Sequence, residues 1–238
     1  MNIVIFGANG PTGQLVTQQA LAEGHTVTAA TRRPETFPIH HPRLHVQRVD
    51  VLDTAAVDRA VAGQDAVLST LGAPYSRKPI IVYSQGVEHI MQSMRRHGVR
   101  RLICVSSSAT DPRVRFHDTQ GGFLFERILK PFLILVVGRT LYADMWRMET
   151  EVMNSDLDWT IVRPSGLFAT SEVTNYRLVE AFANGRYTSR TDLADCMLRL
   201  LSDTRYTRKA VAVVTSAEQP SLLEFLGREA FKRQPATA

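Results

Sequence analysis

Cysteine is nearly absent from this sequence. The 238 residues include two cysteines, Cys104 and Cys196, which lie far apart and match no metal-ligand spacing. These facts exclude a disulfide framework and favour reduced thiols in a cytoplasmic protein. The chain begins on a strand-like run, so we expect no signal peptide. No metal site is predicted either, because the histidines near residue 40 lie in a proline-rich loop.

Long hydrophobic runs are also missing. The most apolar region, 123–137, is interrupted by charged residues and a proline. Its clean stretch, 132–137, is far shorter than the roughly 20 residues that span a bilayer, so we predict no transmembrane segment. Three roles stay open for 111–135, namely a lid, a dimer surface or a membrane-facing patch.

Internal repeats, low-complexity segments and domain linkers are absent, so we expect one domain over residues 1–238. The chain is 44% hydrophobic and 21% charged, with a formal net charge of +5. This balance is typical of a globular protein and favours anionic ligands. Its arginines are scattered and no nucleic-acid module is recognisable, so we expect no nucleic-acid partner.

The most informative segment is the N-terminal one. An apolar run at 3–6 is followed by Gly7-Ala8-Asn9-Gly10-Pro11-Thr12-Gly13 and then by a helix-like segment. A buried strand, a glycine-rich turn and a helix start form the phosphate-binding corner of a Rossmann unit, where helix N–H groups bind a pyrophosphate. The residues expected to bind the cofactor here are Gly7, Asn9, Gly10, Pro11, Thr12 and Gly13.

Apolar and helical segments alternate along the whole chain. This pattern predicts the α/β class, as a single Rossmann-type, doubly wound and mostly parallel sheet with helices on both faces. Substrate-side insertions are expected around 107–139 and 167–187. We expect strands at 3–6, 25–31, 44–49, 65–70, 101–106, 159–162 and 210–215, and helices at 14–23, 54–62, 80–97, 123–137, 140–154, 176–184, 191–202 and 221–232.

In such a sheet the ligand lies beyond the carboxyl ends of the strands. At one of these ends, Arg32 and Arg33 replace the acidic residue that would bind a ribose 2′-hydroxyl. Arginine binds phosphate oxygens, so NADP is favoured over NAD, although a solvated strand end is the alternative. Asp50 is expected either to contact adenine or to cap the next helix. The other strand ends supply further residues that we expect to line the same ligand site: Val51, Leu71, Gly72, Ala73, Ser106, Ser107, Pro164, Ser165 and Gly166.

These motifs resemble a known family. The glycine-rich corner, the basic end of the second strand, Ser69-Thr70-Leu71-Gly72, Val105-Ser106-Ser107 and the segment 159–164 are similar to atypical short-chain dehydrogenase/reductases. More narrowly, they resemble the NAD(P)H-binding group that contains biliverdin reductase B (flavin reductase) and the NmrA-like proteins. The resemblance implies one NADPH-binding Rossmann domain, often monomeric, with the nicotinamide near Ser107 and 164–166.

The chain departs from the wider superfamily in its catalytic motif. Reductases there use Tyr-x-x-x-Lys, in which a lysine on the same helix face lowers the tyrosine pKa. None of the six tyrosines here has a lysine at i+4. Leu141 and Met145 occupy the positions expected for the pair, so a Tyr–Lys proton relay is not predicted.

Two functions remain open. The first is NADPH-dependent hydride transfer to a small planar acceptor, flavin- or quinone-like, with Ser107 orienting the nicotinamide or the substrate. Tyr142 is a second catalytic candidate, and a core or surface tyrosine is the alternative. A flavin would be a substrate, not a bound cofactor. The second function is a non-catalytic NADP(H) redox sensor with a regulatory protein partner. With either function, we expect the protein to be a monomer or a homodimer.

Overall fold

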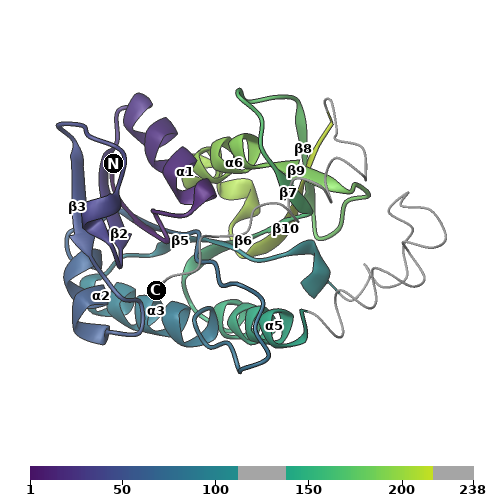
Figure 1. Cartoon of the computed structure of the whole chain (residues 1–238). Coiled ribbons are helices and arrows are strands. Elements are labelled where there is room, and N and C mark those ends of the chain that lie inside the picture. The colour runs from purple at the N-terminus through teal and green to yellow at the C-terminus, as the bar shows by residue number, and fades with distance from the viewer. Residues whose placement is uncertain (112–137, 217–238) are drawn as a thin grey trace.

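The computed structural model describes residues 1–111 and 138–216, and Figure 1 shows a sheet between layers of helices. The eight strands follow the order β3-β2-β1-β4-β5-β6-β10-β8. All neighbouring pairs are parallel except β10–β8. The predicted doubly wound fold is confirmed. The strands are β1 (Asn2–Phe6), β2 (Thr26–Thr31), β3 (Leu44–Arg48), β4 (Ala66–Ser69), β5 (Arg101–Val105), β6 (Asp158–Pro164), β8 (Tyr176–Glu180) and β10 (Lys209–Thr215).

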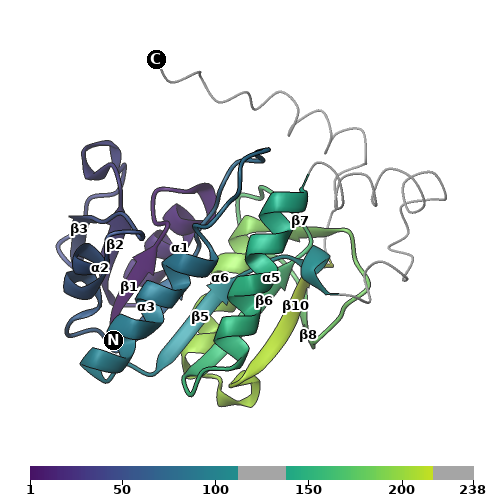
Figure 2. The same ribbon diagram turned by 90° about the horizontal axis from the view of Figure 1, so that it is seen from below.

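Helices cover both faces of this sheet (Figures 1 and 2). One face carries α1 (Pro11–Ala22) and α6 (Arg190–Ser202), and the other carries α2 (Thr54–Val61), α3 (Ser84–His97) and α5 (Arg139–Met153). Figure 2 shows α3 and α5 side by side on the second face. Shorter elements are η1 (Pro34–Thr36), η2 (Ser108–Thr110), η6 (Thr204–Tyr206) and a small parallel sheet of β7 (Gly166–Phe168) and β9 (Tyr187–Ser189).

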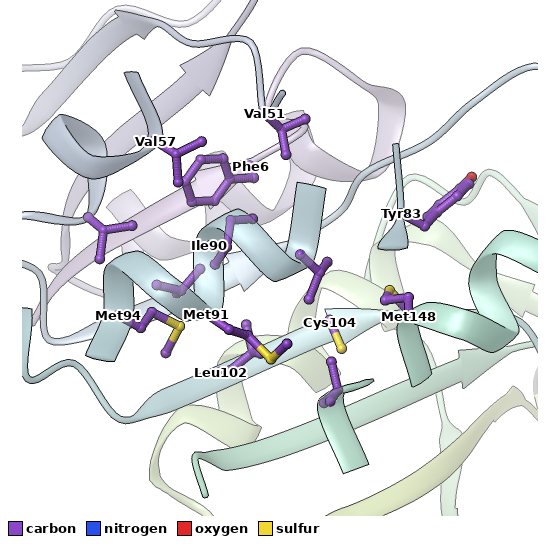
Figure 3. Close-up of a cluster of buried hydrophobic side chains, with 14 of the residues drawn as sticks. Phe6, Val51, Val57, Tyr83, Ile90, Met91, Met94, Leu102, Cys104 and Met148 are labelled. Atoms are coloured by element: carbon purple, nitrogen blue, oxygen red, sulfur yellow. The ribbon is translucent and has the colours of Figure 1, made fainter. Parts of the chain in front are cut away.

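Strand β1 lies at the centre of the apolar core. Its side chains alternate between the faces, so Val4 and Phe6 pack beneath α2 and α3, while Ile3 and Ile5 pack beneath α1 and α6. All four side chains are buried. Figure 3 shows Phe6 within the first of these clusters. Burial on both faces explains why the strand is a continuous apolar run in the sequence.

Some element ends differ from the sequence predictions. Helix α1 begins at Pro11 instead of 14, because proline fits the first helical position. Helix α3 begins at Ser84 instead of 80, where Asp144 of α5 accepts hydrogen bonds from the backbone N–H groups of Tyr83 and Ser84. Strand β6 extends through Pro164, although a turn was expected from residue 163. The predicted helices 123–137 and 221–232 lie outside the described residues.

The helix expected at 176–184 is wrong, because this segment forms strand β8. Strand β8 forms the edge of the sheet and pairs with β10, which places Leu178 opposite Val213 and Val179 opposite Ala212. The pairing satisfies backbone groups and buries apolar surface that an isolated helical turn would leave exposed. Ala181 then adopts a φ of 70°, a left-handed conformation that a helix cannot continue through.

The β1–α1 corner depends on close backbone contacts. Gly7 has a φ of +77°, and a Cβ there would lie 2.6 Å from the carbonyl oxygen of Thr70. A Cβ on Gly13 would overlap the Gly7 carbonyl oxygen and lie 2.7 Å from Ala8 Cα. Both obstacles are backbone atoms, which no rotamer change can move. Glycine is therefore required at these positions.

We predict that Gly13→Ala lowers the free energy of unfolding by at least about 2 kcal/mol, because overpacked backbone contacts must separate. Urea unfolding followed by circular dichroism measures this change. Gly72→Ala is the matched control, since nothing lies within 4 Å of a Cβ at Gly72. A similarly small decrease in the free energy of unfolding of both variants would contradict the proposed role of the close backbone contact at Gly13.

Candidate functional site

The N-terminus of α1 has the features of an anion site. Gly10 is its N-cap, with no side-chain cap, and Pro11 follows at the first position. Thr12 and Gly13 carry the first N–H groups of the helix, which have no carbonyl partner within it. These N–H groups and the positive end of the helix dipole favour a bound phosphate.

Asn9 connects this corner to the turn after β2. The Gln14 side-chain amide donates to the Asn9 carbonyl at 3.0 Å, and the Asn9 amide donates to the Thr36 hydroxyl at 3.2 Å. The Thr36 hydroxyl in turn donates to the Arg33 carbonyl at 3.1 Å. The Asn9 side chain therefore fixes the glycine-rich turn relative to Arg33, and its predicted cofactor contact stays a prediction.

Arg32 and Arg33 lie at the end of β2 with exposed side chains. Neither guanidinium has a side-chain partner within residues 1–111 and 138–216. The neighbouring Arg48 differs, because it pairs with Glu35 at 2.8 Å and donates to the Arg32 carbonyl. Two free positive charges therefore lie at the strand end where a ribose phosphate would bind.

The adenine side of the predicted site is built by the ends of β3 and β4. Asp50 is exposed and accepts a hydrogen bond from the Leu52 N–H at 3.0 Å, while Asp53 caps α2. The capping alternative for Asp50 is therefore wrong. Val51 and Leu71 converge over Gly86 of α3, where a Cβ would lie 3.3 Å from Val51 Cγ1 and 3.4 Å from Leu71 Cδ1.

The segment after β4 is held by the hydroxyl of Tyr83. This oxygen accepts the Ala73 N–H at 3.0 Å, directly after Leu71 and Gly72. Burial raises the pKa of Tyr83 to about 12, so the phenol stays neutral. The same residue is fixed from α5 through the Asp144 carboxylate. Helix α5 therefore positions the β4 strand end.

Ser107 and Tyr142 lie on neighbouring elements, because α5 packs against η2, which follows Ser107 directly. Burial and the neighbouring Tyr75 raise the pKa of Tyr142, and hydrogen bonding with Ser107 opposes that rise. The Tyr142 hydroxyl lies 3.3 Å from the Tyr75 hydroxyl. Leu141 and Met145 are buried in the core, and Trp146 at i+4 from Tyr142 is exposed. Tyr142 is thus a neutral phenol with no lysine at the usual spacing.

Arg163 is a buried residue of this region that the sequence analysis missed. Its side chain is 8% exposed and bonds to both carboxylate oxygens of Glu149, at 3.0 and 2.7 Å. It also pairs with Asp111 at 2.9 Å. The Thr110 hydroxyl lies 2.8 Å from Glu149 Oε1 and 2.7 Å from the Ser107 carbonyl oxygen. The cluster therefore fixes the backbone that carries Ser107.

The remaining predicted residues lie at the ends of β5 and β6. The Ser106 hydroxyl is buried and has no hydrogen-bond partner in the part of the chain that the structure describes. The Ser165 hydroxyl donates to the Gly185 carbonyl at 2.9 Å, and the Gly166 N–H donates to the Arg186 carbonyl at 2.9 Å. Pro164–Gly166 therefore anchors the following insertion, while the buried Ser106 hydroxyl is unpaired among the described residues.

Other kinds of site were sought in the described residues. Among them, no group of three His, Cys, Asp or Glu side chains is arranged to hold a metal ion. No helix of the same residues is long and apolar enough to cross a membrane.

The strand order reverses between β1 and β4, directly beside the glycine-rich corner. A parallel sheet with this order and a helix N-terminus at the reversal defines a Rossmann-type dinucleotide-binding protein. The model of the NAD(P)H-binding family matches residues 7–204, and the chain belongs to that family. The chain is therefore an NAD(P)H-binding protein, and its fold is the one that the resemblance to short-chain dehydrogenase/reductases implies.

Similar proteins and structures are known. An uncharacterised chloroplastic protein of Arabidopsis thaliana is 27% identical over 230 residues, covering 92% of this chain and 78% of that protein. A short-chain dehydrogenase/reductase structure from Veillonella parvula has a TM-score of 0.76 at 20% identity, covering 93% and 98% of the two chains. Another from the same organism, in complex with NADP, has a TM-score of 0.74 at 20% identity, covering 92% and 98%.

We predict that Arg163→Met lowers the free energy of unfolding by about 3–5 kcal/mol, because it removes the buried positive charge that pairs with two buried carboxylates. Urea unfolding measures the loss. Arg199→Met is the matched control, since Arg199 pairs with Asp195 but is 69% exposed. Arg199→Met should lower the free energy of unfolding by less than about 1 kcal/mol.

Adding Glu149→Gln to Arg163→Met should recover part of the lost stability, because it removes one unpaired charge. Equal losses in Arg163→Met and Arg199→Met would contradict a structural role for the buried cluster.

Proposed function

We propose that this protein is an NADPH-dependent oxidoreductase that passes hydride to a small planar acceptor of the flavin or quinone type. The observation that carries the choice of cofactor is the pair of free arginines at the end of β2. A 2′-phosphate would give Arg32 and Arg33 the charged partner that the described residues lack.

The residues at the strand ends fit the other parts of the dinucleotide. The first N–H groups of α1 would bind the pyrophosphate, and Asp50 with Val51 would contact the adenine. The nicotinamide would lie against Leu71–Ala73, Pro164–Gly166 and Ser106, whose buried hydroxyl needs a polar partner. When bound, NADPH supplies a hydride and its electron pair to the acceptor.

The chain's own contribution is mainly positioning. Ser107 is fixed by the buried Arg163 cluster and would orient the nicotinamide or the acceptor. Tyr142 would face the same space as a neutral hydrogen-bond donor. No lysine lies at i+4 to lower its pKa, which favours an acceptor that needs little help from an enzymic acid. Flavins and quinones are acceptors of this kind.

A non-catalytic NADP(H) redox sensor, as thought for NmrA-like proteins, is the second candidate. The observation that favours it is that Trp146, not a lysine, lies at i+4 from Tyr142, which leaves the phenol without the activation that reductases of this superfamily use. A sensor would need a regulatory protein partner, and neither function calls for nucleic acid.

The single domain, the cytoplasmic location and the monomer or homodimer state stay predictions. The same holds for the insertions at 107–139 and 167–187 as a substrate-side wall. Residues 112–137 lie outside the described part of the chain.

We predict that Arg32→Glu weakens NADPH binding by about 10- to 100-fold, because a charge-assisted bond is worth about 1.5–3 kcal/mol. NADH affinity should change by less than about threefold, since NADH has no 2′-phosphate. Isothermal titration with each nucleotide measures both constants.

Arg95→Glu is the control for the Arg32 variant, because it changes the net charge equally at the far end of α3. An unchanged preference for NADPH in Arg32→Glu would show that this arginine does not read the 2′-phosphate.

Turnover separates the two functions. We predict NADPH oxidation at 340 nm with quinones or FMN as acceptors, alongside binding of NADPH to the same preparation. Binding without oxidation on any of FMN, FAD, quinones and aldehydes would favour the sensor. Failure to bind either nucleotide would contradict both functions.

A further inference from the structure

Glu35 lies in the short helical turn η1, directly after the two arginines at the end of β2. The turn is fixed at both of its ends. The Arg33 N–H donates to the Thr31 hydroxyl at 3.2 Å, and the side chain of Phe37 is buried in the core beneath α1. The chain therefore holds a carboxylate beside the strand end where a ribose phosphate would bind.

Arg48 connects this carboxylate to the end of β2. Strands β2 and β3 lie side by side at one edge of the sheet (Figure 1), and their pairing places Arg48 opposite Thr31. One terminal nitrogen of the guanidinium donates to the Arg32 carbonyl, and the other donates to a Glu35 carboxylate oxygen, both at 2.8 Å. A single guanidinium therefore holds the Glu35 carboxylate beside the backbone of Arg32.

This ion pair has little to contribute to stability. The side chains of Arg48 and Glu35 are 65% and 56% exposed, and water screens ion pairs of this kind. Its effect on a bound nucleotide is larger. A free carboxylate at the end of β2 repels a ribose 2′-phosphate and binds a 2′-hydroxyl, as the acidic residue of an NAD site does. Arg48 neutralises this carboxylate and occupies one of its oxygens.

We propose that Arg48 is a specificity-determining residue, which makes the site prefer NADPH by neutralising Glu35. The proposal rests on the proposed NADPH-dependent function and deepens it. Arg32 and Arg33 would attract the 2′-phosphate directly, whereas Arg48 removes a repulsion. The chain thus carries a basic pair suited to NADP and an acidic residue suited to NAD, and the ion pair decides between the two nucleotides.

Direct contact between Arg48 and the phosphate is the other way in which this arginine would favour NADPH. Both of its terminal nitrogens already have an acceptor within the chain, which favours the indirect role. The two roles also differ in one measurable respect. Neutralising Glu35 compensates for the loss of Arg48 only if Arg48 acts through Glu35.

Isothermal titration with NADPH and with NADH, at low ionic strength where exposed charges are little screened, tests the proposal. Arg48→Met should weaken NADPH binding about three- to tenfold, the effect of one exposed charge repulsion, and NADH binding should not weaken. Glu35→Gln should change the NADPH affinity by less than about twofold, because the charge it removes is already neutralised. The double variant Arg48→Met/Glu35→Gln should return to within about twofold of the wild-type NADPH affinity.

Two further variants serve as controls. Arg48→Lys keeps the positive charge beside Glu35 and should keep most of the preference for NADPH. Arg205→Met removes an arginine from another exposed ion pair, with Asp203, which precedes the start of β10 and lies away from the carboxyl ends of the strands. Its affinity for each nucleotide should equal that of the wild type.

Two results would overturn the proposal. The first is an unchanged NADPH affinity in Arg48→Met. The second is a loss that persists in the double variant, since it would indicate direct contact with the phosphate or displacement of Arg32. Wild-type protein that binds NADH as tightly as NADPH would instead contradict the choice of NADP in the proposed function, and that comparison requires no variant.

Discussion

The close approach of the backbone at the β1–α1 corner is the constraint on which the rest of the site depends. The Cα of Gly13 lies against the backbone of Gly7 and Ala8, so α1 starts directly at the end of β1. That contact sets the direction of the helix N-terminus and therefore the position of a bound phosphate. Because β1 is paired on both sides, the strand ends of β2 and β4 are placed relative to the same point.

The two sides of the site are held by different forces. On the adenine side, Val51 and Leu71 pack over Gly86, and apolar contact suffices because the bound group would be flat and weakly charged. On the nicotinamide side, a buried arginine holds Glu149 and Asp111, and through Thr110 it fixes Ser107. Charged groups at this depth tolerate little displacement, since each lost partner leaves an unpaired buried charge. The side that we propose to orient the reacting atoms is thus the one held by buried charges.

The sequence revealed those parts of the fold and site that depend on local chemistry. Gly7, Gly13 and Pro11 could be interpreted from their neighbours in the chain, and so could the basic end of β2. Strand β8 could not, because its conformation depends on pairing with β10, more than 30 residues along the chain. Arg163 was missed for the same reason, since Asp111 and Glu149 become its partners only in the folded chain. A proline directly after it suggested a turn instead.

What limits the chemistry is the character of Tyr142. The glycine-rich corner and the arginines concern only the cofactor, and they would be equally useful to an enzyme and to a sensor. A reductase must also control a proton, and within residues 1–111 and 138–216 the polar groups recorded beside Tyr142 are the hydroxyls of Tyr75 and Ser107. Hydroxyls cannot stabilise a phenolate by charge, but they can pass a proton in either direction. These side chains therefore have a catalytic use only with an acceptor that takes its proton at oxygen.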